Sequence, residues 1–314
     1  MASVMSEAVA RALQDGAPVV ALESTIITHG LPRPENLAAA LEFEQTVADG
    51  GAVPATIALL DGVAHVGLAR DQLERLAQSE TAVKLSARDL PIAIAQGLTG
   101  GTTVAATALL ASQAGIRVFA TGGIGGVHRD ARNTLDESAD LGILGGSRIT
   151  VVSAGIKSIL DIGATLERLE SLSVPVVVFG TDRFPAFWLT DSGHRVGPPV
   201  TAAAEVAAIM KAADELALPG GILVANPLPE AEQLEPAVHD RLLAEALEAA
   251  ERTAVRGKDV TPFLLAYIHE HTGRRSVDVN LEIVRRNCAL AAEIACAWTA
   301  LRGAGPQSEM RLPR

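Results

Sequence analysis

The chain has 314 residues, of which 48% are hydrophobic, 20% charged and only 3% aromatic, and its formal net charge is -11 at pH 7. This composition indicates a soluble globular protein whose core is built from aliphatic side chains. The negative charge argues against a nucleic-acid polymer as partner, because such binding needs a basic surface that neutralises many phosphates. A small phosphorylated ligand remains compatible with it, since a few local donors suffice.

Three features of the sequence indicate where in the cell the protein is located. The N-terminus lacks a cleavable signal pattern, no apolar run is long enough to cross a bilayer, and the two cysteines, Cys288 and Cys296, form no disulfide framework. We therefore expect a cytoplasmic protein without membrane contact. No repeat or linker divides the sequence, which predicts a single α/β domain over residues 1–303 and a disordered tail over 304–314.

The first half of the chain alternates between helical and strand patterns. A helical pattern covers 5–13, and a buried strand is expected at 19–22, ahead of a polar loop. Two short strand patterns around the turn Asp61-Gly62 predict a hairpin or an edge excursion within 52–68. The other elements expected here are helices at 36–47, 71–78 and 100–114 and strands at 82–85 and 117–120.

The second half continues the alternation and ends in helices. The strands expected here lie at 149–152, 174–179 and 222–225. Helices are expected at 156–169, 200–216, 235–255, 261–271 and 279–301, with a shorter one opening at 136–140. This order predicts an α/β protein with a three-layer α/β/α fold, a mostly parallel central sheet and a helical C-terminal part. Ligands of such sheets bind where the strands end, at their carboxyl edge.

Three ionisable side chains stand at predicted strand ends: Glu23, Lys84 and Lys157. Lys157 follows small residues at 153–155, and the helix expected at 156–169 places it in a first turn, where the dipole and partial burial favour the neutral amine. A neutral amine is what a covalent nucleophile requires. An ion-paired lysine at a helix start explains the same pattern, so the residues alone leave both interpretations open.

Carboxylates and a hydroxyl gather over residues 136–140, beside a glycine-rich loop at 122–126. One carboxylate together with waters suits a hard divalent cation near a phosphate. Capping of the following helix needs only one of the acids and explains the block equally well. Both interpretations stay open at this level.

Seven stretches together carry a family resemblance. They are residues 21–30 (ALESTIITHG), 51–57 (GAVPATI), 121–129 (TGGIGGVHR), 136–140 (DESAD) and 153–161 (SAGIKSILD), with Asn226-Pro227 and Asn280. In this combination the chain resembles the pseudouridine-5'-phosphate glycosidases over about residues 8–302. The resemblance implies an α/β/α fold, a homotrimer and a divalent metal, typically manganese. It also implies reversible conversion of pseudouridine 5'-phosphate and water into uracil and ribose 5-phosphate.

The resemblance also assigns roles to individual residues. It implies that Glu23 is the proton donor, Lys157 the nucleophile and Asp136 the metal ligand. The substrate-contacting positions that it implies are Lys84, Val104, Ser138, Ala139, Asp140 and Asn280. Two rival functions are a lysine-dependent lyase or aldolase of another sugar phosphate, which would keep Lys157 with a different acid, and a nucleotide-binding regulatory module. The module is disfavoured, because mere binding does not require an activated amine.

Overall fold

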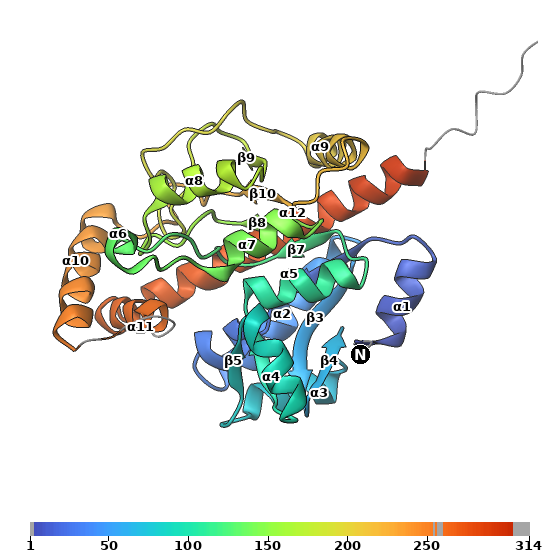
Figure 1. Ribbon diagram of the computed structural model, residues 1–314, viewed down its shortest axis with the longest axis horizontal. Helices are drawn as coiled ribbons and strands as arrows, with labels where there is room; N and C mark the ends of the chain where they lie inside the picture. Colours follow the sequence, from blue (N-terminus) through green and yellow to red (C-terminus); the bar gives the residue numbers. More distant parts are fainter. Residues whose placement is uncertain (1–2, 254, 256–259, 304–314) are drawn as a thin grey trace, which may run out of the picture.

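In a computed structural model, which describes residues 3–253, 255 and 260–303, ten strands form one sheet with helices on both faces (Figure 1). The strands are β1 (Val4–Met5), β2 (Val19–Leu22), β3 (Val53–Leu60), β4 (Val63–Val66), β5 (Val83–Leu85), β6 (Gly100–Thr102), β7 (Val118–Ala120), β8 (Thr150–Ser153), β9 (Val176–Val178) and β10 (Ile222–Ala225). Their order along the sheet is β1-β4-β3-β2-β7-β8-β10-β9, and β6 pairs with both β3 and β5.

The central pairs of the sheet are all parallel. β2 lies between β3 and β7, and β8 lies between β7 and β10, with Leu22 opposite Ala120 and Ala225 opposite Ser153. Only β4 and β6 run antiparallel to their neighbour β3, and β4 makes the predicted hairpin around Asp61. The carboxyl ends of β2, β7, β8 and β10 therefore meet at one edge. The prediction of a mostly parallel sheet is confirmed.

The central strands carry apolar side chains on both faces of the sheet, and helices cover both faces. The helices are α1 (Glu7–Gln14), α2 (Glu35–Asp49), α3 (Arg70–Gln78), α4 (Leu90–Ala95), α5 (Val104–Gln113), α6 (Ala131–Thr134), α7 (Ala139–Gly146), α8 (Ile162–Ser171), α9 (Ala203–Glu215), α10 (Pro236–Arg252), α11 (Val260–His271) and α12 (Arg275–Gly303), with a π-turn η1 (Ile26–Gly30) and a 3-10 turn η2 (Ala87–Asp89).

Alternate strand residues face opposite helical layers, as a pleated strand requires. Val20 and Val224 pack in a cluster with α2, α9 and α12, whereas Ala21 and Leu223 pack in a cluster with α5 and α7. These two clusters are the two interfaces of an α/β/α sandwich. The three-layer prediction is confirmed.

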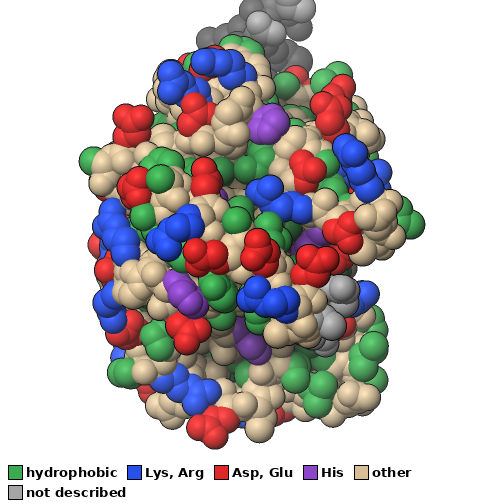
Figure 2. All heavy atoms as spheres, turned by 90° about the vertical axis from the view of Figure 1, so that its left-hand side faces the viewer, with side chains coloured by type: hydrophobic (Ala, Val, Ile, Leu, Met, Phe, Trp, Pro, Cys, Tyr) green, Lys and Arg blue, Asp and Glu red, His purple; other side chains and the backbone are tan. Residues whose placement is uncertain are grey.

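The long helix α12 crosses the molecule, α11 packs against it, and α10 packs against α11 (Figure 1). Seen from the end where α10 lies, acidic and basic side chains are interspersed over the surface (Figure 2). Within the described residues, no helix combines the length and apolarity that a bilayer span requires. The predicted tail, 304–314, lies outside the described residues, and the single domain over 1–303 stays a prediction.

Two expected helices begin later than the sequence indicated. Residues 100–102 form β6 instead of a helix start, since Gly101 lacks a side chain and lies so close to Ser24 that a Cβ would be 2.8 Å from its carbonyl oxygen. The helix expected at 156–169 begins only at Ile162, because Asp161 caps it by accepting a hydrogen bond from Ala164 N at 3.0 Å. The apolar residues of this stretch, Ile156, Ile159 and Leu160, are core residues of a loop.

Candidate active site

Glu23 follows the last residue of β2 and is half-buried at the carboxyl edge of the sheet. One of its carboxylate oxygens accepts a hydrogen bond from the hydroxyl of Thr121, the first residue after β7. Burial raises the pKa of Glu23 above its ordinary value of 4.5, against the opposing charge of Lys157 and the Thr121 hydrogen bond. The nearby charges of Asp140 and Lys84 also act on it, the first raising and the second lowering this pKa. Glu23 thus binds a proton more readily than an ordinary carboxyl does.

Two of the four lysines of the chain lie around Glu23; the four are Lys84, Lys157, Lys211 and Lys258. Lys84 is the middle residue of β5, in register with Gly101 of β6. Lys157 is half-buried in a stretch, 151–160, that is otherwise buried. Because Lys157 lies in a loop ahead of α8, the expected placement in a helical first turn was wrong, and the argument from a helix dipole does not apply to it.

Asp140 joins three elements next to this group. Its side chain is buried and accepts hydrogen bonds from Ala105 N at 2.9 Å and from Gly125 N at 2.7 Å, while Asp140 N donates to Ser138 Oγ at 3.2 Å. The carboxylate therefore ties the start of α5 and the glycine-rich loop to the start of α7, where Ser138 is the N-cap. The two interpretations of residues 136–140 were metal binding and helix capping. This geometry favours a structural role for Asp140 over metal binding.

The same junction holds two more of the predicted substrate contacts. Val104 is the first residue of α5 and is buried, and Ala139 is the first residue of α7 and is exposed. The structure thus brings these two residues together with Ser138 and Asp140, and Asp140 connects them to Glu23. Their roles toward a substrate stay predictions.

Asp136 was the predicted metal ligand. Its Oδ2 lies 3.9 Å from His128 Nδ1, and among the described residues no group of three or more His, Cys, Asp or Glu side chains is placed to hold a metal. One partly exposed carboxylate with an adjacent imidazole suits a hard cation whose other ligands are waters or substrate oxygens, but not a cage made of protein alone. The residues present fit a metal of that open kind.

Asn280, the last of the predicted contacts, lies on α12. Its amide oxygen accepts a hydrogen bond from Trp188 Nε1 at 2.7 Å, and its amide nitrogen is 3.5 Å from His269 Nε2. The side-chain partners of Asn280 therefore belong to an aromatic group that also contains Phe187. The structure does not join Asn280 directly to Glu23 and Lys157 through these bonds.

Sequence reasoning gave no separate role to Thr121 or to its support. Asn287, buried on α12, donates from Nδ2 to Thr121 O at 2.7 Å and accepts from Asn226 Nδ2 at 3.0 Å. Thr121 could have been found as the first polar residue after a strand, the rule that selected Glu23. Asn287 carries no such signal, because only the fold brings α12 under this edge of the sheet.

Substitution of Gly125 tests whether the packing around Asp140 supports the fold. A methyl group at Gly125 would collide with the Ser138 side chain and lie 2.9 Å from Asp140 Oδ2. We expect Gly125→Ala to destabilise the fold by about 1–3 kcal/mol, through overpacking, and to lower activity. Gly142 on α7 is the matched control, since a Cβ there meets nothing within 4 Å and Gly142→Ala should be neutral or stabilising. Urea unfolding of both variants measures the difference, and equal stabilities would contradict it.

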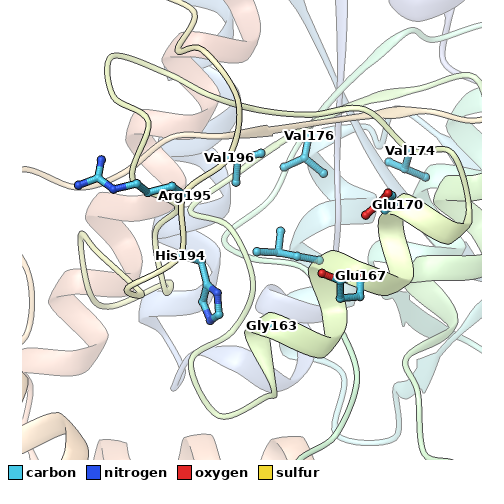
Figure 3. A pocket seen from close by; sticks show the side chains of 9 residues that line it. Gly163, Glu167, Glu170, Val174, Val176, His194, Arg195 and Val196 are labelled. Carbon is cyan, nitrogen blue, oxygen red and sulfur yellow. The ribbon is translucent and has the colours of Figure 1, made fainter.

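A cavity of about 550 Å³ lies elsewhere on the surface, between α8 and the loop at 194–196 (Figure 3). Its lining includes Glu167 and Glu170 of α8 together with Val176, and none of the predicted site residues. Arg195 also lines the cavity, but its guanidinium points away from it (Figure 3). This group pairs with Asp182 at 2.5 Å. We therefore place the candidate site at Glu23.

The fold is that of an α/β enzyme, and its candidate site is the carboxyl–amine group at the carboxyl edge of the parallel sheet. A family model described as "Indigoidine synthase A like protein" matches residues 8–297. The pseudouridine-5'-phosphate glycosidase of Saccharopolyspora erythraea is 57% identical, covering 94% of this chain and 97% of that protein, and the one of Frankia alni is 56% identical, covering 95% and 82%. The chain belongs to this family of indigoidine synthase A-like proteins, among the pseudouridine-5'-phosphate glycosidases, and the predicted resemblance is confirmed.

Solved structures agree with this placement. The prealnumycin C-glycosynthase AlnA in complex with ribulose 5-phosphate is 35% identical, with a TM-score of 0.89 over 96% of this chain and 99% of that chain. An indigoidine synthase A-like protein of Thermotoga maritima is 37% identical, with a TM-score of 0.86 over 95% and 97%. The whole described sandwich is therefore a fold shared with these proteins.

Proposed function

We propose that the chain cleaves the carbon-carbon glycosidic bond of pseudouridine 5'-phosphate, reversibly, to give uracil and ribose 5-phosphate. The observation that carries the proposal is the group around Glu23, in which a carboxyl with a raised pKa lies beside Lys157 and Lys84. The names of the relatives give the substrate, and the AlnA complex supports a pentose phosphate as ligand of this fold.

The chemistry explains why a proton donor and an amine are needed together. A carbon-linked uracil is a poor leaving group, so direct departure from a closed ribose is unfavourable. In the proposed mechanism Glu23 protonates the ring oxygen as its bond to the anomeric carbon breaks, and the amine of Lys157 bonds to that carbon and loses a proton. The nitrogen lone pair then breaks the carbon-carbon bond while carbon 5 of uracil takes up a proton. Water releases the resulting lysine imine, and ribose 5-phosphate closes again.

The proposal extends to the roles of the remaining residues. Lys84, Val104, Ser138, Ala139, Asp140 and Asn280 are proposed substrate contacts, as the family resemblance implies. Asp136 would hold a divalent cation, typically manganese, whose charge would offset that of the substrate phosphate. A homotrimer and a cytoplasmic location belong to the same proposal.

The assay follows uracil release from pseudouridine 5'-phosphate by the purified protein with manganese, with borohydride added to trap a lysine imine. We expect uracil together with a pentose-phosphate adduct on Lys157, located by peptide mass spectrometry. Folded protein that releases no uracil would overturn the proposed substrate. If such protein forms a borohydride-trapped adduct with another sugar phosphate, the reaction is instead that of a lysine-dependent lyase or aldolase.

Removal of the metal gives a further expectation. Chelation with EDTA should lower uracil release by about tenfold or more, and added Mn²⁺ should restore it. Asp136→Asn should require a higher Mn²⁺ concentration for the same rate, because a carboxylate ligand is lost. Asp130→Asn is the matched control, since Asp130 lies at the other end of the short helix α6 and its carboxylate accepts a hydrogen bond from Asn133. Full activity of metal-free protein would contradict this assignment.

A further inference from the structure

The backbone around Lys157 is held by side chains and carbonyls from outside its own loop. Lys157 N donates to Ile124 O of the glycine-rich loop at 3.1 Å. Arg129 donates from Nη2 to Ser158 O at 3.0 Å and from Nε to Ile159 O at 3.2 Å. Since no helix supplies hydrogen bonds at these residues, the two carbonyls after Lys157 depend on Arg129 for their partners.

A second contact fixes the residue after Lys157 through its side chain. Ser158 is buried, and its Oγ lies 2.7 Å from Nε2 of His239, which is buried on α10. The other ring nitrogen, Nδ1, lies 3.0 Å from Asp240 Oδ1.

The tautomer of His239 follows from this arrangement. An ionised carboxylate only accepts hydrogen bonds, so Nδ1 carries the proton and Nε2 is left to accept one from the Ser158 hydroxyl. Burial lowers the pKa of His239 despite the nearby Asp240, which agrees with a neutral ring. The Ser158 hydroxyl is thereby held in one orientation.

We propose that His239 is a positioning residue for Lys157: with Arg129 it fixes the peptide that follows the nucleophile and so keeps the amine aimed at the sugar carbon. This inference rests on the proposed function, in which Lys157 forms the covalent adduct. A lysine has a long flexible stem, and its reach is defined only if its own backbone is fixed. Small displacements of a reacting group are costly, so loosening this peptide acts on the chemical step more than on substrate binding.

The experiment compares Ser158→Ala, His239→Leu and His239→Gln with the wild type. The control is His194→Leu, because His194 is an exposed histidine on the loop beside the other cavity. Each protein is assayed for kcat and KM of uracil release, for the single-turnover rate of the borohydride-trapped adduct on Lys157, and for thermal unfolding. Rates are normalised to the amount of protein that can be trapped, so a loss of folded protein alone does not change them.

We expect Ser158→Ala and His239→Leu each to lower kcat and the adduct rate by about 10- to 100-fold, with KM changed by less than about twofold. Because the two side chains act as one pair, the double variant should be no slower than the slower single variant. The carboxamide oxygen of His239→Gln can accept from Ser158 and should recover most of the rate. His194→Leu should match the wild type.

The outcomes separate this inference from the proposed function. If the wild-type protein releases no uracil and forms no adduct, both the proposed function and the positioning role are overturned. An active wild type with Ser158→Ala at the full rate overturns only the positioning role, and so does a His239→Gln variant as slow as a folded His239→Leu. If His239→Leu does not fold, Ser158→Ala decides, since it removes a single oxygen atom.

Discussion

Lys157→Ala is expected to lower kcat for uracil release by about 10³-fold or more and to abolish the borohydride-trapped adduct, because the variant lacks the amine that bonds to the sugar. Lys157→Arg should be equally inactive. A guanidinium keeps the positive charge next to Glu23 but is not deprotonated in proteins, so it supplies no nucleophile. The arginine variant therefore separates covalent chemistry from electrostatic stabilisation, and its retention of turnover would refute the nucleophile assignment.

The small number of lysines makes the site of attachment readable. Of the described lysines, Lys84, Lys157 and Lys211, the first two act on the pKa of Glu23, and Lys258 lies outside the described residues. Lys84→Ala should weaken substrate binding, seen as a higher KM, while the trapped adduct stays on Lys157. An adduct found on Lys84 in the wild type would move the nucleophile to β5 and leave Lys157 as a binding residue.

The sequence allowed the layers and most elements of this fold to be predicted, for a physical reason. Strands such as β2 and β10 are short apolar runs bounded by turns or polar residues, so their bounds could be taken from the pattern. The loop that carries Lys157 defeated the same reasoning. Ile156, Ile159 and Leu160 are apolar because they are core residues, and apolar residues do not by themselves distinguish a helix from a buried loop.

The candidate site also contains residues that the sequence predicted and residues that it did not. Glu23 was selected as a polar residue at a strand end, and the structure places it where β2 ends. Lys84 was selected by the same rule, but it is the middle residue of β5, which pairs with β6 and not with the central strands. Its charge still acts on Glu23, as does that of Lys157 from its loop. The supporting residues were out of reach, since Asn287 and His239 come from α12 and α10. Their partners, Thr121 and Ser158, are distant in sequence, and no local pattern records such pairings.

Glu23→Gln is expected to lower kcat by about 10²- to 10⁴-fold, the range lost when a positioned general acid is removed. Glutamine preserves the size of the side chain and can still accept the hydrogen bond from Thr121, so the change removes the transferable proton with little else. Substrate binding should be nearly retained, and KM should change far less than kcat. A variant with wild-type turnover would show that another group protonates the ring oxygen.

The same variant has an expected signature in pH dependence. Since burial raises the pKa of Glu23 above 4.5, kcat/KM of the wild type should fall as the pH rises through this raised value, where the donor loses its proton. The residual activity of Glu23→Gln should lack that step, because a carboxamide does not titrate. A step of the same size in both proteins would assign it to a different group.

Glu23→Gln should raise the stability of the fold at high pH although it lowers activity. Between pH 4.5 and the raised pKa, the folded wild type binds more protons at Glu23 than the unfolded chain does, so its free energy of unfolding decreases as the pH rises through that window. Glutamine has no such linkage. Glu23→Gln should therefore be more stable than the wild type at pH above the raised pKa, and this advantage should shrink as the pH falls toward 4.5. Urea unfolding at a series of pH values measures the difference in the free energy of unfolding. If Glu23→Gln is less stable than the wild type at the alkaline end, the ionised carboxylate stabilises the fold through Lys157 and Lys84.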